Sequence, residues 1–147
     1  MARYETTIHT PWSADRAFEY MSDLRHFADW DPGVKRVVQI LGHAPGLSST
    51  YDVTVASPGR DLTLRYETVA FDAPRRVEVR AQSRTLLSVD VVTVAPAGPN
   101  GVAVTYTADL SLNGFLGIAN PLLGLAFNRI GDRAAKGLHR ALEATAP

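Results

Sequence analysis

Residues 34–112 are a succession of short segments in which apolar and polar residues alternate, separated by turns that contain proline, glycine, asparagine or serine. Alternation with a period of two is typical of strands with one buried face, and short connections between consecutive strands form an antiparallel meander. One long helical pattern, residues 120–144, follows the meander and begins with the favourable helix start Asn120-Pro121. Since only this helix is long enough to cover the apolar face of such a sheet, the sheet is expected to curl around it.

The segment before residue 34 adds one strand and two short helices to this plan. Alternation over residues 3–8 predicts the strand, and Ser13 and Asp23 are each placed to cap a helix. The run Trp30-Asp31-Pro32-Gly33 ends the second helix, because a residue before proline avoids the helical conformation. The expected fold is therefore α+β: a curved seven-stranded antiparallel sheet wrapped around a long C-terminal helix, with two short helices after the first strand.

Charge pairing predicts the register of one hairpin in this sheet. Residues 62–68 and 77–81 alternate strictly, and pairing them across the turn Asp72-Ala73-Pro74 places Glu67 opposite Arg80. Opposite charges that face each other across two strands stabilise an antiparallel pair, so this register is favoured over its neighbours.

Composition limits the class of protein. The chain has 147 residues, 46% hydrophobic and 20% charged, which is typical of a single folded domain, expected over 1–147. Lys plus Arg and Asp plus Glu both total 15, so the cationic excess that nucleic acids or anionic membranes require is missing. The N-terminus is polar rather than signal-like, and the most apolar stretch, residues 115–127, is shorter than a membrane span. We therefore expect a cytoplasmic monomer or homodimer with no stable membrane insertion.

Residue types for metal, thiol and nucleotide chemistry are missing or scattered. The chain has no cysteine, which removes disulfides, thiolate ligands and cysteine nucleophiles together. The four histidines, no two of them spaced four residues apart, are His9, His26, His43 and His139. Neither a phosphate-binding glycine loop nor a Gly-x-Ser-x-Gly nucleophile motif occurs. The sequence therefore predicts no metal and no cofactor.

Polar side chains on the inner face of the sheet are the best candidates for a site. Strand alternation directs Tyr51, Tyr66 and Tyr106 inward. One interpretation is that each tyrosine packs its ring in the core and satisfies its hydroxyl locally. The other is that the hydroxyls point into a cavity and orient a ligand, as a few polar groups do in mostly apolar sites.

Asp90 is the candidate for proton transfer. If Val92 and Val94 face inward, as pairing across the last hairpin requires, Ser88 and Asp90 face inward too. Burial raises the pKa of a carboxyl towards the range that suits a general acid or base. A one-residue bulge would instead turn Asp90 outward and leave only a surface charge.

Glycines recur at seven-residue intervals in and before the long helix, at Gly117, Gly124 and Gly131. Each glycine inside a helix costs about 1 kcal/mol relative to alanine, so close packing, open volume for a ligand or simple tolerance must explain them. We expect open volume at Gly124, close packing at Gly131, and a cavity open to solvent near the short helices and the start of the long helix. Further residues expected to contact a ligand are Leu64, Phe115, Phe127 and Asn128.

Four basic residues recur on one side of the same helix: Arg129, Arg133, Lys136 and Arg140. Mixed charge on an amphipathic helix is typical of a solvated face, and a basic stripe for an anionic partner is the alternative.

Three segments resemble a known family. Ile8-His9-Thr10-Pro11 leads into the first short helix, Trp30-Asp31-Pro32-Gly33-Val34 follows Asp23, and Gly101-Val102-Ala103-Val104-Thr105-Tyr106 opens the last strand before the long helix. This arrangement resembles the START-like helix-grip superfamily (SRPBCC), and within it the polyketide cyclase/dehydrase and lipid-transport branch. The resemblance covers essentially the whole chain and implies the same fold.

That family includes aromatic-polyketide cyclases, plant hormone receptors, pollen-allergen-like carriers, lipid-transfer domains and co-chaperones, so the fold alone assigns no activity. The resemblance implies a hydrophobic ligand, polyketide-, lipid- or steroid-like, held between sheet and long helix by a carrier or by a cyclase or dehydratase. If the chain is a catalyst, we expect Asp90 to transfer the proton while Tyr66 and Tyr106 place the substrate. The alternative is a co-chaperone-like module that binds a protein through its surface.

Overall fold

The computed structural model describes residues 2–56, 59–99, 101–113 and 120–144, and of residues 120–125 the helical backbone alone. The elements follow in the order β1 (Ala2–Thr10), α1 (Ala14–Ser22), η1 (Leu24–His26), α2 (Phe27–Trp30), β2 (Val34–Leu41), β3 (Thr50–Val55), β4 (Leu62–Asp72), β5 (Arg76–Gln82), β6 (Leu86–Pro96), β7 (Val102–Leu112) and α3 (Asn120–Glu143). The 3₁₀ turn η1 continues into α2, and together they form the second short helix. This order confirms the one expected from the sequence.

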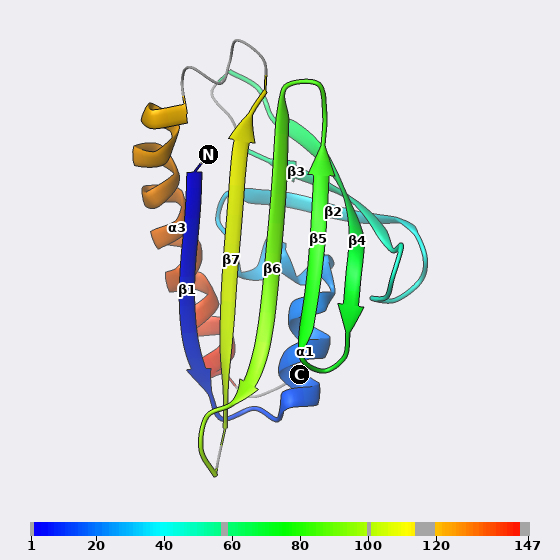
Figure 1. Cartoon of the computed structure of the whole chain (residues 1–147), viewed down its shortest axis with the longest axis vertical. Coiled ribbons are helices and arrows are strands. Elements are labelled where there is room, and N and C mark those ends of the chain that lie inside the picture. Colours follow the sequence, from blue (N-terminus) through cyan, green and yellow to red (C-terminus); the bar gives the residue numbers. More distant parts are fainter. Residues whose placement is uncertain (1, 57–58, 100, 114–119, 145–147) are drawn as a thin grey trace.

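All seven strands form one antiparallel sheet in the order β1-β7-β6-β5-β4-β3-β2 (Figure 1). The meander from β2 to β7 joins neighbours in sequence, and β1 pairs with β7 from Ala2 opposite Leu110 to Thr10 opposite Val102. Glu67 lies opposite Arg80, which confirms the predicted register. The fold is the START-like helix-grip fold.

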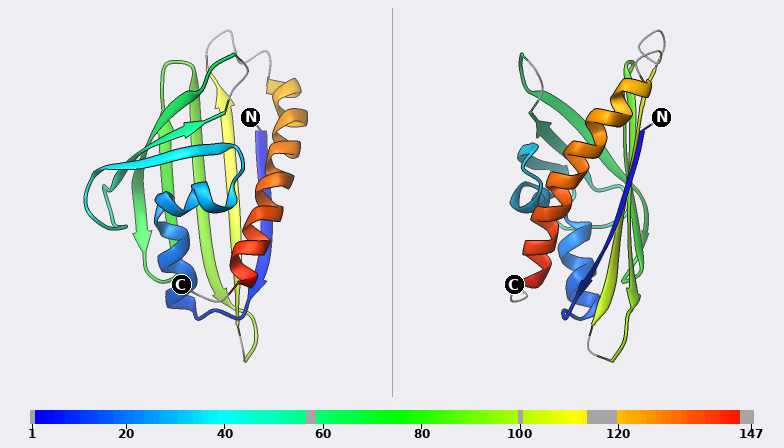
Figure 2. Two further views of the ribbon diagram at one scale, coloured as in Figure 1. Left: turned by 180° about the vertical axis from the view of Figure 1, so that it is seen from behind. Right: turned by 90° about the vertical axis from the view of Figure 1, so that its left-hand side faces the viewer.

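The helices lie on one face of the curved sheet (Figure 2). α3 packs against β1 and α2, while α1 packs against β6. The predicted caps are present: the Ser13 hydroxyl accepts the Arg16 amide at 3.2 Å, and the Asp23 carboxylate accepts the Arg25 amide at 3.0 Å. The four basic residues of α3 are exposed, as expected of a solvated face.

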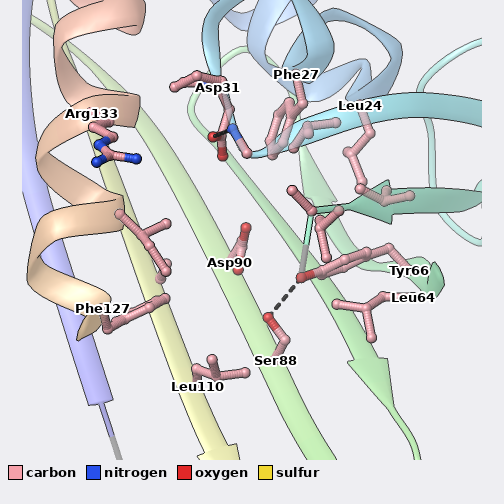
Figure 3. A pocket seen from close by; sticks show the side chains of 18 of the residues that line it. Leu24, Phe27, Asp31, Leu64, Tyr66, Ser88, Asp90, Leu110, Phe127 and Arg133 are labelled. Atoms are coloured by element: carbon pink, nitrogen blue, oxygen red, sulfur yellow. Dashed lines mark hydrogen bonds between the residues drawn. The ribbon is translucent and has the colours of Figure 1, made fainter. Parts of the chain in front are cut away.

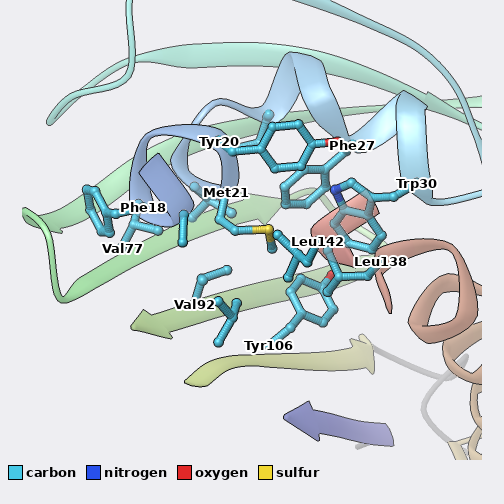
Figure 4. Close-up of a cluster of buried hydrophobic side chains, with 14 of the residues drawn as sticks. Phe18, Tyr20, Met21, Phe27, Trp30, Val77, Val92, Tyr106, Leu138 and Leu142 are labelled. Carbon is cyan, nitrogen blue, oxygen red and sulfur yellow. The ribbon is translucent and has the colours of Figure 1, made fainter. Parts of the chain in front are cut away.

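Large buried side chains fill the part of the interior that lies between α1, α2 and the end of α3 (Figure 4). Met21, Leu138 and Leu142 are fully buried there. The Trp30 ring stands edge-on to the Tyr106 ring, with centroids 5.5 Å apart. Because Tyr106 is held in this way by the core, the position of its hydroxyl at the other end of the ring is also determined.

Two glycines allow α3 to approach its neighbours closely. A Cβ atom at Gly131 would overlap the ring of Tyr4 on β1, so the close packing expected at this glycine is present. A Cβ atom at Gly137 would overlap the backbone carbonyl of Trp30, so Gly137 lets the helix backbone lie against the end of α2. The seven-residue spacing did not single out Gly137. The surroundings of Gly124 lie outside the described residues.

Candidate functional site

A cavity of about 380 Å³ lies between the inner face of the sheet, the end of α2 and the first half of α3 (Figure 3). Most of its wall is apolar and includes Leu24, Phe27, Val53, Leu64, Leu110 and Phe127. Ile130, which is 50% exposed, and the exposed Arg133 also line it, so its α3 side meets solvent. The cavity predicted near the short helices and the long helix is therefore present.

Asp90 faces this cavity from the middle of β6. The inner residues of the strand, from Leu86 to Val94, alternate with partly exposed ones, so the unbulged register holds and Asp90 is only 7% exposed. Its Oδ2 atom accepts a hydrogen bond of 2.5 Å from the Tyr106 hydroxyl on β7. Burial raises the pKa of the Asp90 carboxyl to about 7; the Tyr106 hydrogen bond opposes this shift and the nearby Asp31 carboxyl adds to it.

A second hydrogen-bonded pair, formed by two hydroxyl groups, lies beside Asp90. The Tyr66 hydroxyl from β4 and the Ser88 hydroxyl from β6 are 2.7 Å apart, and both residues line the cavity. Burial raises the pKa of the Tyr66 phenol, and so does the neighbouring Asp90 charge; the same two causes raise the pKa of Tyr106. Both phenols therefore stay protonated at neutral pH and are available as hydrogen-bond donors.

Asp31 and Arg133 complete the polar part of the lining, and the sequence analysis assigned neither of them to the site. Asp31 lies in the connection between α2 and β2, where its Oδ1 atom accepts the Gly33 amide at 2.8 Å. Burial raises its pKa, and this hydrogen bond acts in the opposite direction. The sequence did contain one indication of this position. Asp31 belongs to the run Trp30-Asp31-Pro32-Gly33, which ends the second short helix, and the end of this helix lies beside the cavity.

The other predicted site residues fall into four groups. Leu64 and Phe127 line the cavity together with Tyr66, Tyr106 and Asp90. Tyr51 is fully buried but is not among the residues that line the cavity, and burial and the nearby Asp23 charge raise its pKa to about 12. Asn128 is exposed on α3. Phe115 and the surroundings of Gly124 lie outside the described residues.

The site is thus a largely apolar cavity with carboxyl and hydroxyl groups in its lining. Among the residues that the structure describes, no group of three or more His, Cys, Asp or Glu side chains is placed to hold a metal ion. Within the same ranges, no helix combines the length and the apolar character that crossing a membrane requires. Proton donation and acceptance are the chemistry that these groups can supply.

Tyr106→Phe is expected to raise the pKa of Asp90 above about 7, because the variant loses the hydrogen bond that stabilises the ionised carboxylate. A hydrogen bond to a charged group is worth about 1.5–3 kcal/mol, so an increase of about one pH unit or more is expected. The titration can be followed by NMR of the ¹³C-labelled Asp90 carboxyl. Tyr66→Phe is the matched control and should have the smaller effect, because Tyr66 bonds Ser88. An unchanged Asp90 titration in Tyr106→Phe would contradict this prediction.

A family model described as polyketide cyclase/dehydrase and lipid transport matches residues 1–143 of the chain. Comparison with the sequences of curated proteins finds no significant match.

Solved structures with a similar fold include a START superfamily protein from Mycobacterium smegmatis, with 13% identity and a TM-score of 0.77 over 97% of each chain. The Zhui aromatase/cyclase from Streptomyces sp. R1128 has 14% identity and a TM-score of 0.73 over 95% of this chain and 90% of that one. A norcoclaurine synthase point mutant from Thalictrum flavum, solved with a transition-state analogue, has 18% identity and a TM-score of 0.59 over 91% and 94%. At these identities the likeness shows the fold.

Proposed function

Because the chain belongs to the polyketide cyclase/dehydrase and lipid transport family, we propose that it binds one lipophilic small molecule in the cavity between sheet and α3. The observation that carries this proposal is the buried Asp90–Tyr106 pair, which faces an otherwise largely apolar space. A volume of about 380 Å³ falls within the range of small-molecule sites. A buried carboxyl costs stability, and a role toward a ligand accounts for its presence.

The ligand carries at least one polar group, since Asp90, Ser88, Tyr66 and Tyr106 offer hydrogen bonds on the inner wall of the cavity. We infer a catalyst of the cyclase or dehydratase kind rather than a passive carrier. A carboxyl with a pKa of about 7 exchanges protons at neutral pH, which is the property that a general acid or base needs. Two of the structural neighbours are named as an aromatase/cyclase and a synthase, which is consistent with this inference.

A protein-binding module is the second candidate. Val38, Ile40 and Leu41 are 48%, 42% and 59% exposed on the edge strand β2, and an exposed apolar edge is a feature of interaction surfaces. A surface role of this kind gives no reason for burying Asp90 against a cavity. We therefore place ligand binding first.

Ala108→Phe tests the proposal by filling the cavity. Ala108 is buried on the inner face of β7 and lines the cavity, so a phenyl group there would occupy the ligand volume. A panel of aromatic polyketides, steroids and fatty acids is tested by thermal shift. A ligand present at a hundred times its Kd stabilises the wild-type protein by about 2.7 kcal/mol, and the variant is expected to lose that response.

Ala103→Phe is the matched control, because Ala103 lies on the same strand, is partly exposed and belongs to the opposite face of the sheet. It should respond to ligand as the wild type does. Binding of a panel member with unchanged affinity by a folded Ala108→Phe protein would exclude the cavity as the binding site. A wild type that binds no panel member would favour the protein-binding alternative.

A further inference from the structure

Asp31 lies across the cavity from Asp90. The two carboxyl groups come from different walls, Asp31 from the connection after α2 and Asp90 from the sheet, and both line the cavity. Figure 3 shows the Asp31 carboxyl directed toward Asp90, with Arg133 on α3. A molecule in the cavity would therefore lie between two carboxyl groups.

The surroundings of the two carboxyls differ: burial raises the pKa of both, and the Asp90 carboxyl is the more completely buried of the two. Asp90 is buried, and burial favours its neutral acid form up to about pH 7, although the Tyr106 and Ser88 hydroxyls oppose this increase in pKa. Asp31 is half-buried and its Oδ1 atom accepts a backbone amide, while the exposed Arg133 guanidinium lines the same cavity. Two carboxyls whose environments differ in this way can divide the roles of acid and base. The charge on Asp31 itself raises the pKa of Asp90, so the state of Asp31 helps to set that of Asp90.

We propose that Asp31 is a second proton-transfer residue of the cavity, which accepts a proton from the bound molecule while Asp90 donates one to it. This proposal rests on the proposed function, because it requires a ligand in the cavity. It assigns a chemical class to that ligand: a molecule with a carbonyl group next to a carbon that carries hydrogen.

The step balances within the cavity. The ligand C–H bond breaks, its proton goes to the Asp31 carboxylate, and its electron pair forms a carbon–carbon double bond. The carbonyl oxygen becomes a hydroxyl by taking the proton of Asp90. The result is an enol, a protonated Asp31 and an ionised Asp90, and the reverse step restores the start. Neither an oxidant nor a reductant is needed.

Other charged or titratable groups surround the two carboxyls. Among the described residues these are Tyr66 from β4, Tyr106 and Asp109 from β7, and Arg133 from α3. Both phenols stay protonated because burial raises their pKa, and arginine stays charged. Proton exchange near neutral pH within this group is therefore carried by the carboxyls.

Deuterium exchange of a model ketone tests the proposal. The full chain is incubated with 2-tetralone in D₂O, and loss of the signal of the hydrogens next to the carbonyl is followed by ¹H NMR. Wild type is expected to accelerate exchange over buffer. Asp31→Asn and Asp90→Asn are each expected to lose about a hundredfold of that acceleration, with the affinity for the ketone changed only a few-fold. Asp61→Asn, which replaces an exposed carboxylate paired with Lys35, is the control and should exchange at the wild-type rate.

A second measurement separates a role in proton transfer from a structural one. In the free protein, the Asp90 carboxyl should titrate below about pH 7 when Asp31 is replaced by asparagine, because a neighbouring negative charge has been removed. An unchanged Asp90 titration, or exchange at the wild-type rate in Asp31→Asn, overturns the proposal. Failure of the ketone alone to bind, while other panel members do, also counts against it. If no member of the panel binds at all, it is the proposed function that fails.

Discussion

The substitution Asp90→Asn is expected to raise the free energy of unfolding by about 4 kcal/mol more at pH 8 than at pH 4. The Asp90 carboxyl titrates near pH 7 in the folded protein, against 3.8 for an ordinary aspartate. Between these values the folded chain holds a proton that the unfolded chain has lost. Raising the pH through this window therefore favours unfolding of the wild type, and asparagine, which does not titrate, removes that penalty.

Urea unfolding of both proteins from pH 4 to pH 8 measures this difference. Groups that do not interact with Asp90 titrate alike in both proteins and cancel in the comparison. Asp52→Asn is a control of opposite sign: the hydrogen bond from Arg65 holds the pKa of Asp52 below its usual value, so this carboxylate stabilises the fold as the pH rises above about 4. A stability difference between wild type and Asp90→Asn that stays constant from pH 4 to pH 8 would mean that Asp90 titrates normally.

Gly137→Ala is expected to destabilise the protein by about 3 kcal/mol or more. The added Cβ atom would overlap the carbonyl oxygen of Trp30, and all three of its nearest neighbours are backbone atoms of Trp30. Relief would require α3 to move away from α2, which carries the buried Trp30 ring against Tyr106. The gain in helix propensity, about 1 kcal/mol, is too small to offset this.

Chemical unfolding of Gly137→Ala and two comparison variants measures this effect. Gly131→Ala should cost less, because its Cβ atom meets the half-exposed side chain of Tyr4 rather than backbone. Gly46→Ala should change the free energy of unfolding by under about 0.5 kcal/mol, since its nearest neighbour is 4.0 Å away. Wild-type stability of Gly137→Ala would show that the two helices are not packed as closely as described.

Local pattern was sufficient for the fold and for half of the site. The turn residues and the alternation between them predicted the strands and the Glu67–Arg80 register, and they left an inward Asp90 as one of two alternatives. These features depend on neighbours a few residues away, or on the next strand of a meander, and a period of two assigns every residue to a face.

Inward orientation alone did not separate the tyrosines that line the cavity from the one that is packed in the core. Tyr51 and Tyr66 obey the same alternation and are direct partners across β3 and β4, yet Tyr66 lines the cavity and the fully buried Tyr51 does not. Asn128 shows the same limit on a helix, since its position did not indicate whether it faced the sheet or solvent. Where a helix crosses a sheet depends on the packing of all the elements together.

The sequence by itself determined the order of the elements, the pairing of neighbours in the meander, and the face to which the tyrosines belong. It left the face of Asp90 open. The tertiary structure alone decided which walls enclose the cavity and that Asp31, Asp90 and Arg133 all line it. These three residues come from a loop after a short helix, a central strand and the long helix, which no local period relates. A cavity is the volume that packing leaves unfilled, and the pKa of a carboxyl inside it follows from burial and from charges distant in the chain. Both are properties of the whole arrangement of sheet and helices.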